Sequence, residues 1–287
     1  MTNDSPLRII LWGTGFVGTM VLAEILDNPA WELAGVIVND PAKHGRDVGE
    51  LVGRAPTGLT ASTDAAEVLA READAVAYYG PTAEFAGDNI RNICDALRAG
   101  KDVVSTAMTP WVYPAVCDDH EIDAVRNACL DGGTSCFTTG IDPGFANDLF
   151  PLTVMGVCGR VDAVRIQEIL NYDSYTGSYH PMGFGKPLEH RALLETTDIH
   201  VYAWGRTIPR IADAMGVELD GIESVYDKWD APADIPTAQG TIPAGTSVEV
   251  MFDIRGIVVG EPSAVIELVN RMGVEAAPDW PRGSLED

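Results

Sequence analysis

The sequence Leu7-Arg-Ile-Ile-Leu-Trp-Gly-Thr-Gly-Phe-Val-Gly18 joins a short apolar run to a glycine-rich turn. Such a run is typical of a central strand in a parallel sheet, which is covered on both faces. Gly13, Gly15 and Gly18 have the spacing G-x-G-x-x-G: the first allows a tight turn, the second lets a pyrophosphate approach, and the third lets the helix pack closely. The spacing therefore predicts a dinucleotide site at the start of a helix over residues 16–26, whose N-terminal N–H groups favour phosphate.

Strand-like and helix-like segments alternate through the first half of the chain. Strands are expected over residues 33–38, 74–79, 101–106 and 134–139, and helices over 83–99 and 118–130, with a short helix ending near 70. This alternation is typical of α/β proteins. We expect residues 1–145 to form an N-terminal Rossmann domain, a doubly wound parallel sheet that binds a dinucleotide.

The second half has a different pattern, in which strands dominate. Strands are expected over residues 161–170, 222–229, 247–259 and 263–271, and residues 195–215 contain a helix closed by Gly216. We expect residues 146–287 to form a second α+β domain for substrate binding and dimerisation, built on an open mixed sheet.

Composition excludes several classes of partner. The chain has 19 basic and 43 acidic residues and a net charge of −24, so nucleic acid and anionic membranes are poor partners. No apolar run is long enough for a membrane span, and no signal peptide is visible. The 5 cysteines form no C-x-x-C pair and no cluster with histidine, so we expect reduced thiols, a cytoplasmic location and no metal site.

The tip of the second strand bears on the choice of cofactor. An acid there binds the ribose hydroxyls of NAD, whereas basic residues accept the 2′-phosphate of NADP. Asn39 is neutral, Lys43 and Arg46 are basic, and Asp40 opposes them, so the sequence favours NADP and leaves NAD possible. The full set of expected cofactor-binding residues is Gly13, Thr14, Gly15, Phe16, Val17, Gly18, Asn39, Lys43, Tyr79, Gly80, Thr82, Ser105, Thr106 and Ala107.

One acid stands out in the first strand of the second domain. The two-residue period places Val164, Ile166, Glu168, Leu170 and Tyr172 on one face. If that face is buried, the pKa of Glu168 rises and suits the side chain to proton transfer. If it faces water, Glu168 is an ordinary surface acid.

Aromatic residues and glycines follow this strand, up to Met182-Gly-Phe-Gly185, and predict a lid over an apolar pocket. No arginine pair is placed to bind a carboxylate, which favours an apolar ketone or amine over an amino acid. The expected substrate-pocket residues are Met108, Pro143, Phe145, Asn147, Asn171, Tyr172, Tyr175, Tyr179 and His180.

Motifs spread over nearly the whole chain resemble the dihydrodipicolinate reductase-like superfamily, and more narrowly the native amine dehydrogenase and 2,4-diaminopentanoate dehydrogenase family. They are Trp12-Gly-Thr-Gly-Phe-Val-Gly18, Gly45-Arg-Asp-Val-Gly-Glu50, Gly100-Lys-Asp-Val-Val-Ser105, Gly140-Ile-Asp-Pro-Gly-Phe145, Gly183-Phe-Gly185 and Gly240-Thr-Ile-Pro-Ala-Gly-Thr246. The resemblance implies a homodimeric enzyme that uses a nicotinamide cofactor to interconvert an amine with its ketone and ammonia.

The chain departs from this family at one position. The resemblance implies a glutamate near the tip of strand 101–106 that positions and deprotonates ammonia, but Ser105-Thr-Ala-Met-Thr-Pro110 contains no carboxylate. The replacement could be Glu168, or Asp142 or Asp148 in the Asp-Pro-Gly-Phe loop; Asp142 could equally be a turn residue before its proline. We take Glu168 and Asp142 as the expected catalytic residues.

Two classes of function remain open from the sequence. The first is an NAD(P)-dependent oxidoreductase that transfers hydride to a C=N or C=O carbon of a small, apolar substrate. The second is a catalytically silent dinucleotide-binding sensor or subunit. Dihydrodipicolinate reductase itself is disfavoured, because the paired histidines, the downstream lysine and the Ser-Gly-Thr segment of that enzyme are missing.

Overall fold

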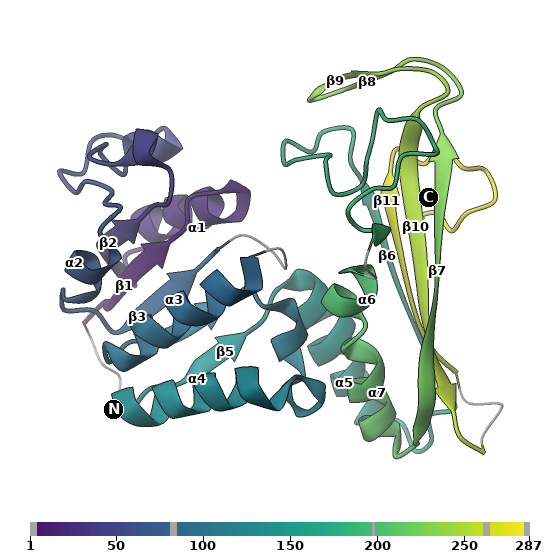
Figure 1. Ribbon diagram of the computed structural model, residues 1–287, viewed down its shortest axis with the longest axis horizontal. Helices are drawn as coiled ribbons and strands as arrows, with labels where there is room; N and C mark the ends of the chain where they lie inside the picture. Colours follow the sequence, from purple (N-terminus) through teal and green to yellow (C-terminus); the bar gives the residue numbers. More distant parts are fainter. Residues whose placement is uncertain (1–4, 81–84, 197–198, 261–264, 284–287) are drawn as a thin grey trace. The chain divides into compact units, whose positions relative to one another are not determined.

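The computed structural model describes residues 5–80, 85–196, 199–260 and 265–283. The chain divides into two compact units, Met1–Gly140 and Ile141–Asp287 (Figure 1). The boundary expected from the sequence, between residues 145 and 146, lies within the first helical segment of the second unit, Ile141–Leu149.

The first unit contains a 5-stranded sheet in the order β2-β1-β3-β4-β5. Its strands are β1 (Leu7–Trp12), β2 (Trp31–Ile37), β3 (Ala75–Tyr78), β4 (Asp102–Ser105) and β5 (Cys136–Thr138). Every neighbouring pair is parallel, so all the carboxyl ends lie at one edge of the sheet. The strand order reverses beside β1, and this reversal creates the position where open α/β sheets bind ligands.

Helices cover both faces of this sheet. They are α1 (Phe16–Asp27), α2 (Ala65–Leu69), α3 (Ala86–Arg98) and α4 (Asp119–Gly132), with short helical turns at η1 (Pro41–Lys43), η2 (Glu50–Val52), η4 (Thr109–Val112) and η5 (Pro114–Val116). Leu11 of β1 packs in a cluster with Leu22 of α1, whereas Ile10 packs in a second cluster with Ile93 and Leu97 of α3. Adjacent residues of one strand enter separate cores, which confirms the doubly wound fold.

The second unit contains a 4-stranded sheet in the order β6-β11-β10-β7. Its strands are β6 (Ala163–Asn171), β7 (Leu219–Asp230), β10 (Ser247–Val258) and β11 (Val265–Gly273). β6 and β11 are parallel and the other pairs are antiparallel, so the mixed sheet is confirmed. A small hairpin, β8 (Ile235–Thr237) with β9 (Gly240–Ile242), was not expected from the sequence.

Helical segments of the second unit pack on one face of its sheet (Figure 1). They are η6 (Ile141–Leu149), α5 (Phe150–Met155), α6 (Ile199–Trp204) and α7 (Thr207–Met215). Ile208 and Ile211 of α7 share a buried cluster with Phe252 and Ile254 of β10. Residues 195–215 were expected to hold one helix and hold two, α6 and α7, which meet at Gly205, a residue type that weakens helix interiors.

A buried ion pair fixes the last described segment to the second sheet. The Arg271 Nε donates to Glu249 Oε1 at 2.6 Å, and the two side chains are 1% and 0% exposed. The Arg271 guanidinium also donates to the carbonyl groups of Ala277 and Trp280, while Glu249 accepts from the backbone N–H of Ala277. In the described ranges, no helix combines the length and the hydropathy needed to cross a membrane.

Candidate active site

The glycine turn between β1 and α1 is crowded at two glycines and open at the third. A Cβ on Gly13 would lie 2.3 Å from the Tyr79 carbonyl oxygen, and one on Gly18 would lie 2.0 Å from the Gly13 carbonyl oxygen. A Cβ on Gly15 would meet nothing within 4 Å. Gly15 also begins α1, and no side chain caps this helix end. The turn therefore fits a dinucleotide, with close packing at its base and free space where a pyrophosphate would approach.

The other expected cofactor-binding residues gather at the same edge of the sheet. They lie at the carboxyl ends of β2, β3 and β4 or in the segments that follow: Asn39, Lys43, Tyr79, Gly80, Ser105, Thr106 and Ala107. Ser105 is fully buried, and its Oγ accepts from the Ala107 N–H at 3.0 Å, so its hydroxyl shapes the turn after β4. Thr82 lies outside the described residues.

The basic side chain of Lys43 is held at the glycine turn. Its Nζ donates to the Thr14 carbonyl oxygen at 2.7 Å and to Thr14 Oγ1 at 3.1 Å. The neighbouring Asp40 caps η1, because its Oδ1 accepts from the Ala42 N–H at 2.9 Å. The positive charge thus lies beside the expected phosphate position, while the carboxylate is engaged with its own helical turn.

The second unit brings two acids together that are far apart in the sequence. Glu168 of β6 and Asn270 of β11 are register partners on adjacent strands. The Asn270 Nδ2 donates to Glu168 Oε2 and to Asp142 Oδ2, both at 2.6 Å. The Trp204 Nε1 donates to the same Asp142 Oδ2 at 2.9 Å. Asp142 and Glu168, the two expected catalytic residues, therefore form one hydrogen-bonded cluster with Asn270 and Trp204.

The environment of Glu168 favours its protonated form. Burial raises the pKa of Glu168 far above its usual 4.5, and the hydrogen bond to Asp142 and the charge of Asp142 add to this effect. The amide of Asn270 acts in the opposite direction, and more weakly. Burial and the neighbouring Asp142 therefore both favour the protonated form of Glu168. From the sequence, Glu168 could be either a buried acid or an ordinary surface acid. In the structure it is partly buried.

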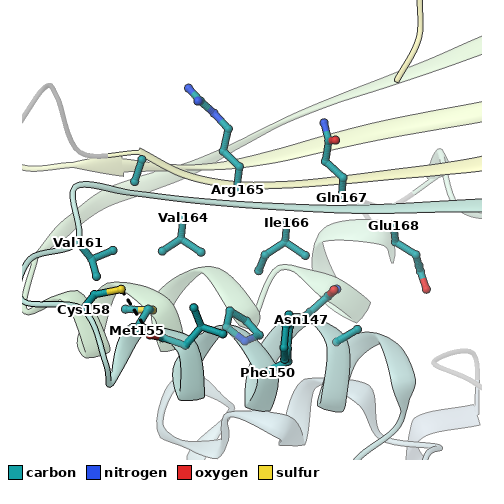
Figure 2. A pocket seen from close by; sticks show the side chains of 14 residues that line it. Asn147, Phe150, Met155, Cys158, Val161, Val164, Arg165, Ile166, Gln167 and Glu168 are labelled. Atoms are coloured by element: carbon teal, nitrogen blue, oxygen red, sulfur yellow. Dashed lines mark hydrogen bonds between the residues drawn. The ribbon is translucent and has the colours of Figure 1, made fainter. Parts of the chain in front are cut away.

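Glu168 also lines a groove of about 540 Å³ between β6 and the segments η6 and α5. Figure 2 shows Val164, Ile166 and Glu168 on the side of β6 that faces this groove, while Arg165 and Gln167 point to the opposite side, as the two-residue period predicts. The walls are mostly apolar and come from α5 and β6; the lining residues include Phe150, Pro151, Val154, Met155 and Val161. The groove is therefore an apolar channel with an acid at one end.

A second polar group in this groove has no partner. Asn147 is fully buried, and neither its Nδ2 nor its Oδ1 forms a hydrogen bond within the described parts of the chain. Figure 2 places this side chain near Glu168, with its amide directed towards β6. A buried amide without partners is costly unless a ligand or water satisfies it. Asn147 thus offers a donor and an acceptor to a molecule in the groove.

Asp148, the third acid considered from the sequence, has a structural role. It is fully buried, and its Oδ2 accepts from the Gly144 N–H at 2.8 Å. Its Oδ1 accepts from Thr207 Oγ1 at 3.3 Å and lies 3.5 Å from Arg210 Nη1. Burial raises the pKa of Asp148, and the Arg210 charge opposes that rise. These contacts tie the Asp-Pro-Gly-Phe loop to α7.

The remaining expected pocket residues are spread over several environments. Tyr172, Tyr175 and Tyr179 form an aromatic cluster, with ring centroids 4.5 Å apart for the first two and 6.4 Å for the last two. Pro143 is buried, Phe145 is exposed and stacks on Phe150, Asn171 and His180 are exposed, and Met108 lies in the core of the first unit. Asn147 is the member of this set that lines the groove. The role of each in substrate binding stays a prediction.

Sequence reasoning missed Asn270 and Trp204. Asn270 is a buried polar residue between apolar same-face neighbours of β11, and this feature could have revealed it. Trp204 gave no such signal, because a tryptophan near the end of a helix is ordinarily a packing residue. Within the described residues, no group of three or more His, Cys, Asp or Glu side chains is arranged to hold a metal ion.

The chain is similar to known proteins in sequence and in structure. The chain is 36% identical over 281 residues to an amine dehydrogenase of Streptomyces virginiae. The aligned residues make up 96% of this chain and 78% of the relative. It is structurally similar to an amine dehydrogenase from Mycobacterium smegmatis, with a TM-score of 0.79 and 19% identity, over 98% of this chain and 82% of the other. No protein-family model matches the chain.

A more distant structural likeness is to biliverdin reductase from Synechocystis sp. PCC 6803, solved with biliverdin and NADP+. The TM-score is 0.54 at 14% identity, over 93% of this chain and 72% of the other. The Rossmann unit, the glycine turn and the likeness to the Streptomyces protein define an NAD(P)-dependent oxidoreductase. The identity to the Streptomyces protein is high enough to be more specific: the chain belongs to the amine dehydrogenase family.

Proposed function

We propose that this protein interconverts a small, apolar amine with its ketone or aldehyde, with ammonia as the nitrogen source in the reducing direction. Family membership supports the reaction class. The observation that carries the proposal is the pair of Glu168 and Asp142, which share the Asn270 amide as a hydrogen-bond donor, with Glu168 at the end of an apolar groove. It gives the second unit the acid–base groups that an amination needs.

The first unit would hold the cofactor through its glycine turn. Gly15 leaves room for a pyrophosphate, and α1 presents its N-terminal N–H groups to it. A bound nicotinamide cofactor supplies the hydride for the reduction. We propose NADP over NAD, because the Lys43 ammonium lies at the turn and Asp40 is engaged as a cap. The protein's own residues must supply substrate binding and proton transfer.

The groove of the second unit would take the substrate. Its apolar walls suit a hydrocarbon chain or ring, and Arg165 points away from it to pair with Glu267 at 2.9 Å. A substrate carboxylate would therefore find no cation on that side of β6 among the lining residues. Asn147 would donate its Nδ2–H to the substrate carbonyl oxygen and satisfy its unpaired amide.

Ammonium must lose a proton before its nitrogen can attack a carbonyl carbon, since ammonium has no lone pair. The segment Ser105–Pro110 offers no carboxylate for this step. We propose that Glu168 and Asp142 replace the glutamate that the family resemblance implies there. A pair that carries one proton can accept a proton and donate one in the same cycle.

Assembly and location extend the same proposal. We propose a homodimer, because apolar side chains on β7 and β10 are exposed, including Ile222, Val225 and Ile257. The five cysteines lie in the described ranges and none of them forms a disulfide there, which supports a reducing compartment such as the cytoplasm. Size-exclusion chromatography with light scattering tests the dimer.

The test is consumption of NADPH and NADH with a panel of aliphatic and aromatic ketones and aldehydes, with and without a high concentration of ammonium. We expect turnover that requires ammonium and falls about 100-fold or more in Glu168→Gln. Glu223→Gln, an exposed acid on β7, is the matched control and keeps its rate.

Two results would redirect the proposal. Turnover that is indifferent to ammonium makes the protein a carbonyl reductase, an outcome that the missing carboxylate in Ser105–Pro110 favours over a fully inactive protein. Cofactor binding without turnover on any carbonyl makes it a dinucleotide-binding sensor or subunit.

A further inference from the structure

The two carboxyl groups of the pair are not equivalent. Asp142 Oδ2 accepts two hydrogen bonds, from the Trp204 indole N–H and the Asn270 amide, whereas Glu168 accepts one, from Asn270. An indole N–H and an amide NH₂ group can donate but cannot accept, so they favour an ionised carboxylate over a protonated one. These donors therefore stabilise charge on Asp142 more than on Glu168.

The remaining oxygen of Asp142 strengthens this asymmetry. Asp142 Oδ1 is buried and has no N–H or O–H donor in the described ranges. A proton carried by Glu168 is the group that can satisfy this oxygen. The contacts thus specify one arrangement, with Glu168 protonated and Asp142 ionised.

We propose that Asn270 and Trp204 are positioning residues that set Asp142 as the base and Glu168 as the acid of a single carboxyl pair, so that one shared proton serves both halves of the exchange of oxygen for nitrogen. This inference rests on the proposed function and deepens it. Neither residue lines the groove: Trp204 acts through Asp142, and Asn270 acts through both carboxyl groups.

The other charged and titratable groups around the pair do not change the assignment of Asp142 as the base and Glu168 as the acid. Tyr172, which follows β6, and its neighbour Tyr175 are both neutral near pH 7, because burial raises the pKa of each phenol. Asp148 of η6 senses the charge of Asp142, but its nearest cation is Arg210 of α7. Arg210 is paired with Asp148, so the donors of Asn270 and Trp204 decide where the proton lies.

The chemistry balances with one proton on the pair. Asp142 takes a proton from ammonium, and the nitrogen lone pair forms the C–N bond at the carbonyl carbon. One proton moves from nitrogen to oxygen in this adduct, Glu168 gives its proton to the hydroxyl group, and the C–O bond breaks with loss of water. Ketone and ammonium thereby become an iminium ion and water. The proton gained by Asp142 passes to Glu168 and restores the pair.

The test compares two substrates in the native protein and in Trp204→Phe. This variant removes one donor to Asp142 and keeps an aromatic ring against Phe252, whose ring centroid lies 5.1 Å from that of Trp204. The first is a ketone with ammonium. The second is a preformed cyclic imine, which needs neither deprotonation of ammonium nor loss of water. We expect kcat for the ketone reaction to fall about tenfold in Trp204→Phe, while reduction of the cyclic imine keeps its rate.

The pH profile gives the readout that a structural role would not change. Loss of a donor removes stabilisation from the Asp142 carboxylate, so the acid limb of kcat for the ketone reaction moves to higher pH. Asn270→Ser, whose single hydroxyl can serve one carboxyl group and not both, shifts the limb further. Trp229→Phe, on the same sheet and against Trp280, is the matched control and leaves it unchanged.

The outcomes separate this inference from the proposed function. The positioning role would be overturned, and amination left intact, by either of two results. The first is an equal loss of kcat with the ketone and with the imine. The second is an acid limb that does not move in either variant while cofactor affinity stays unchanged. A native protein that reduces ketones without any need for ammonium refutes the proposed function before a variant is made.

Discussion

The glycine turn of the first unit and the carboxyl pair of the second are built in opposite ways. The turn is made of backbone atoms from neighbouring residues, with Gly18 against the Gly13 carbonyl group. The pair is made of side chains from distant parts of the chain: Asn270 is 128 residues from Asp142 and 102 from Glu168. A cofactor site can thus be specified locally, whereas the acid–base site depends on the register of β6 and β11.

The largest effect is expected when a long-range side-chain contact of the second unit is removed. Arg271→Met leaves Glu249 buried without its cation and removes the guanidinium donors from the carbonyl groups that follow β11. We expect the free energy of unfolding to fall by about 3–5 kcal/mol. Chemical denaturation measures it.

The matched control is Arg126→Met, because Arg126 pairs with Asp123 on the exposed surface of α4. Such a pair contributes about 1 kcal/mol or less. If the two variants lose the same small amount, the second unit does not depend on its buried long-range contacts, and the contrast with the first unit fails.

The second test concerns the backbone contacts of the glycine turn. Gly18→Ala places a methyl group 2.0 Å from the Gly13 carbonyl oxygen, so we expect a loss of about 1–3 kcal/mol in the free energy of unfolding. Gly15→Ala meets no atom within 4 Å, and its φ of −76° suits alanine, so stability should change by about 0.5 kcal/mol or less.

Cofactor binding should separate the same two variants in the opposite order. Relative to the stability that each variant loses, Gly15→Ala should weaken cofactor binding more than Gly18→Ala. The methyl group of Gly15→Ala enters the space proposed for the pyrophosphate, and we expect the Kd for NADPH, followed by its fluorescence, to rise about tenfold. Unchanged affinity in Gly15→Ala would place the phosphates elsewhere.

The third test uses pH to examine the second unit. The pKa of Glu168 is raised in the folded state, so its contribution to stability is fully present below about pH 4.5 and is lost as the pH rises through the folded value. The stability of the native protein relative to Glu168→Gln should therefore fall above pH 4.5, by up to about 1.4 kcal/mol per pH unit. A difference independent of pH would mean that Glu168 ionises normally.

The smallest expected effect concerns Lys43. Its ammonium lies at the glycine turn, so Lys43→Ala should weaken NADPH binding about fivefold, or about 1 kcal/mol, and change NADH binding less. Parallel titrations with both cofactors measure this. Equal changes for the two would indicate that Lys43 supports the turn without reading the 2′-phosphate.

The sequence predicts local features of this molecule well. The strand and helix pattern of both units and the alternation of Val164, Ile166 and Glu168 along β6 follow from short-range rules and are confirmed. The hairpin of β8 and β9 and the break between α6 and α7 were missed, because weak local preferences there yield to packing.

The composition of the carboxyl cluster could be predicted only in part. Glu168 and Asp142 were identified because acids are conspicuous in an apolar strand and in a glycine-rich loop. Asn270 and Trp204 join them through strand register and helix packing, which no single segment encodes. Met108 follows β4 as expected, but its side chain packs into the core of the first unit, since alternation rules do not apply after a strand ends.

The central claim is that Glu168 carries a proton beside an ionised Asp142 at neutral pH. Isotope-edited infrared spectroscopy of protein labelled with ¹³C at glutamate carboxyl groups, with Glu168→Gln subtracted, tests it without any substrate. We predict a protonated carboxyl band at pH 7 that is absent from the variant and that persists well above the usual pKa of 4.5. A Glu168 carboxyl group that titrates near pH 4.5 would contradict the account.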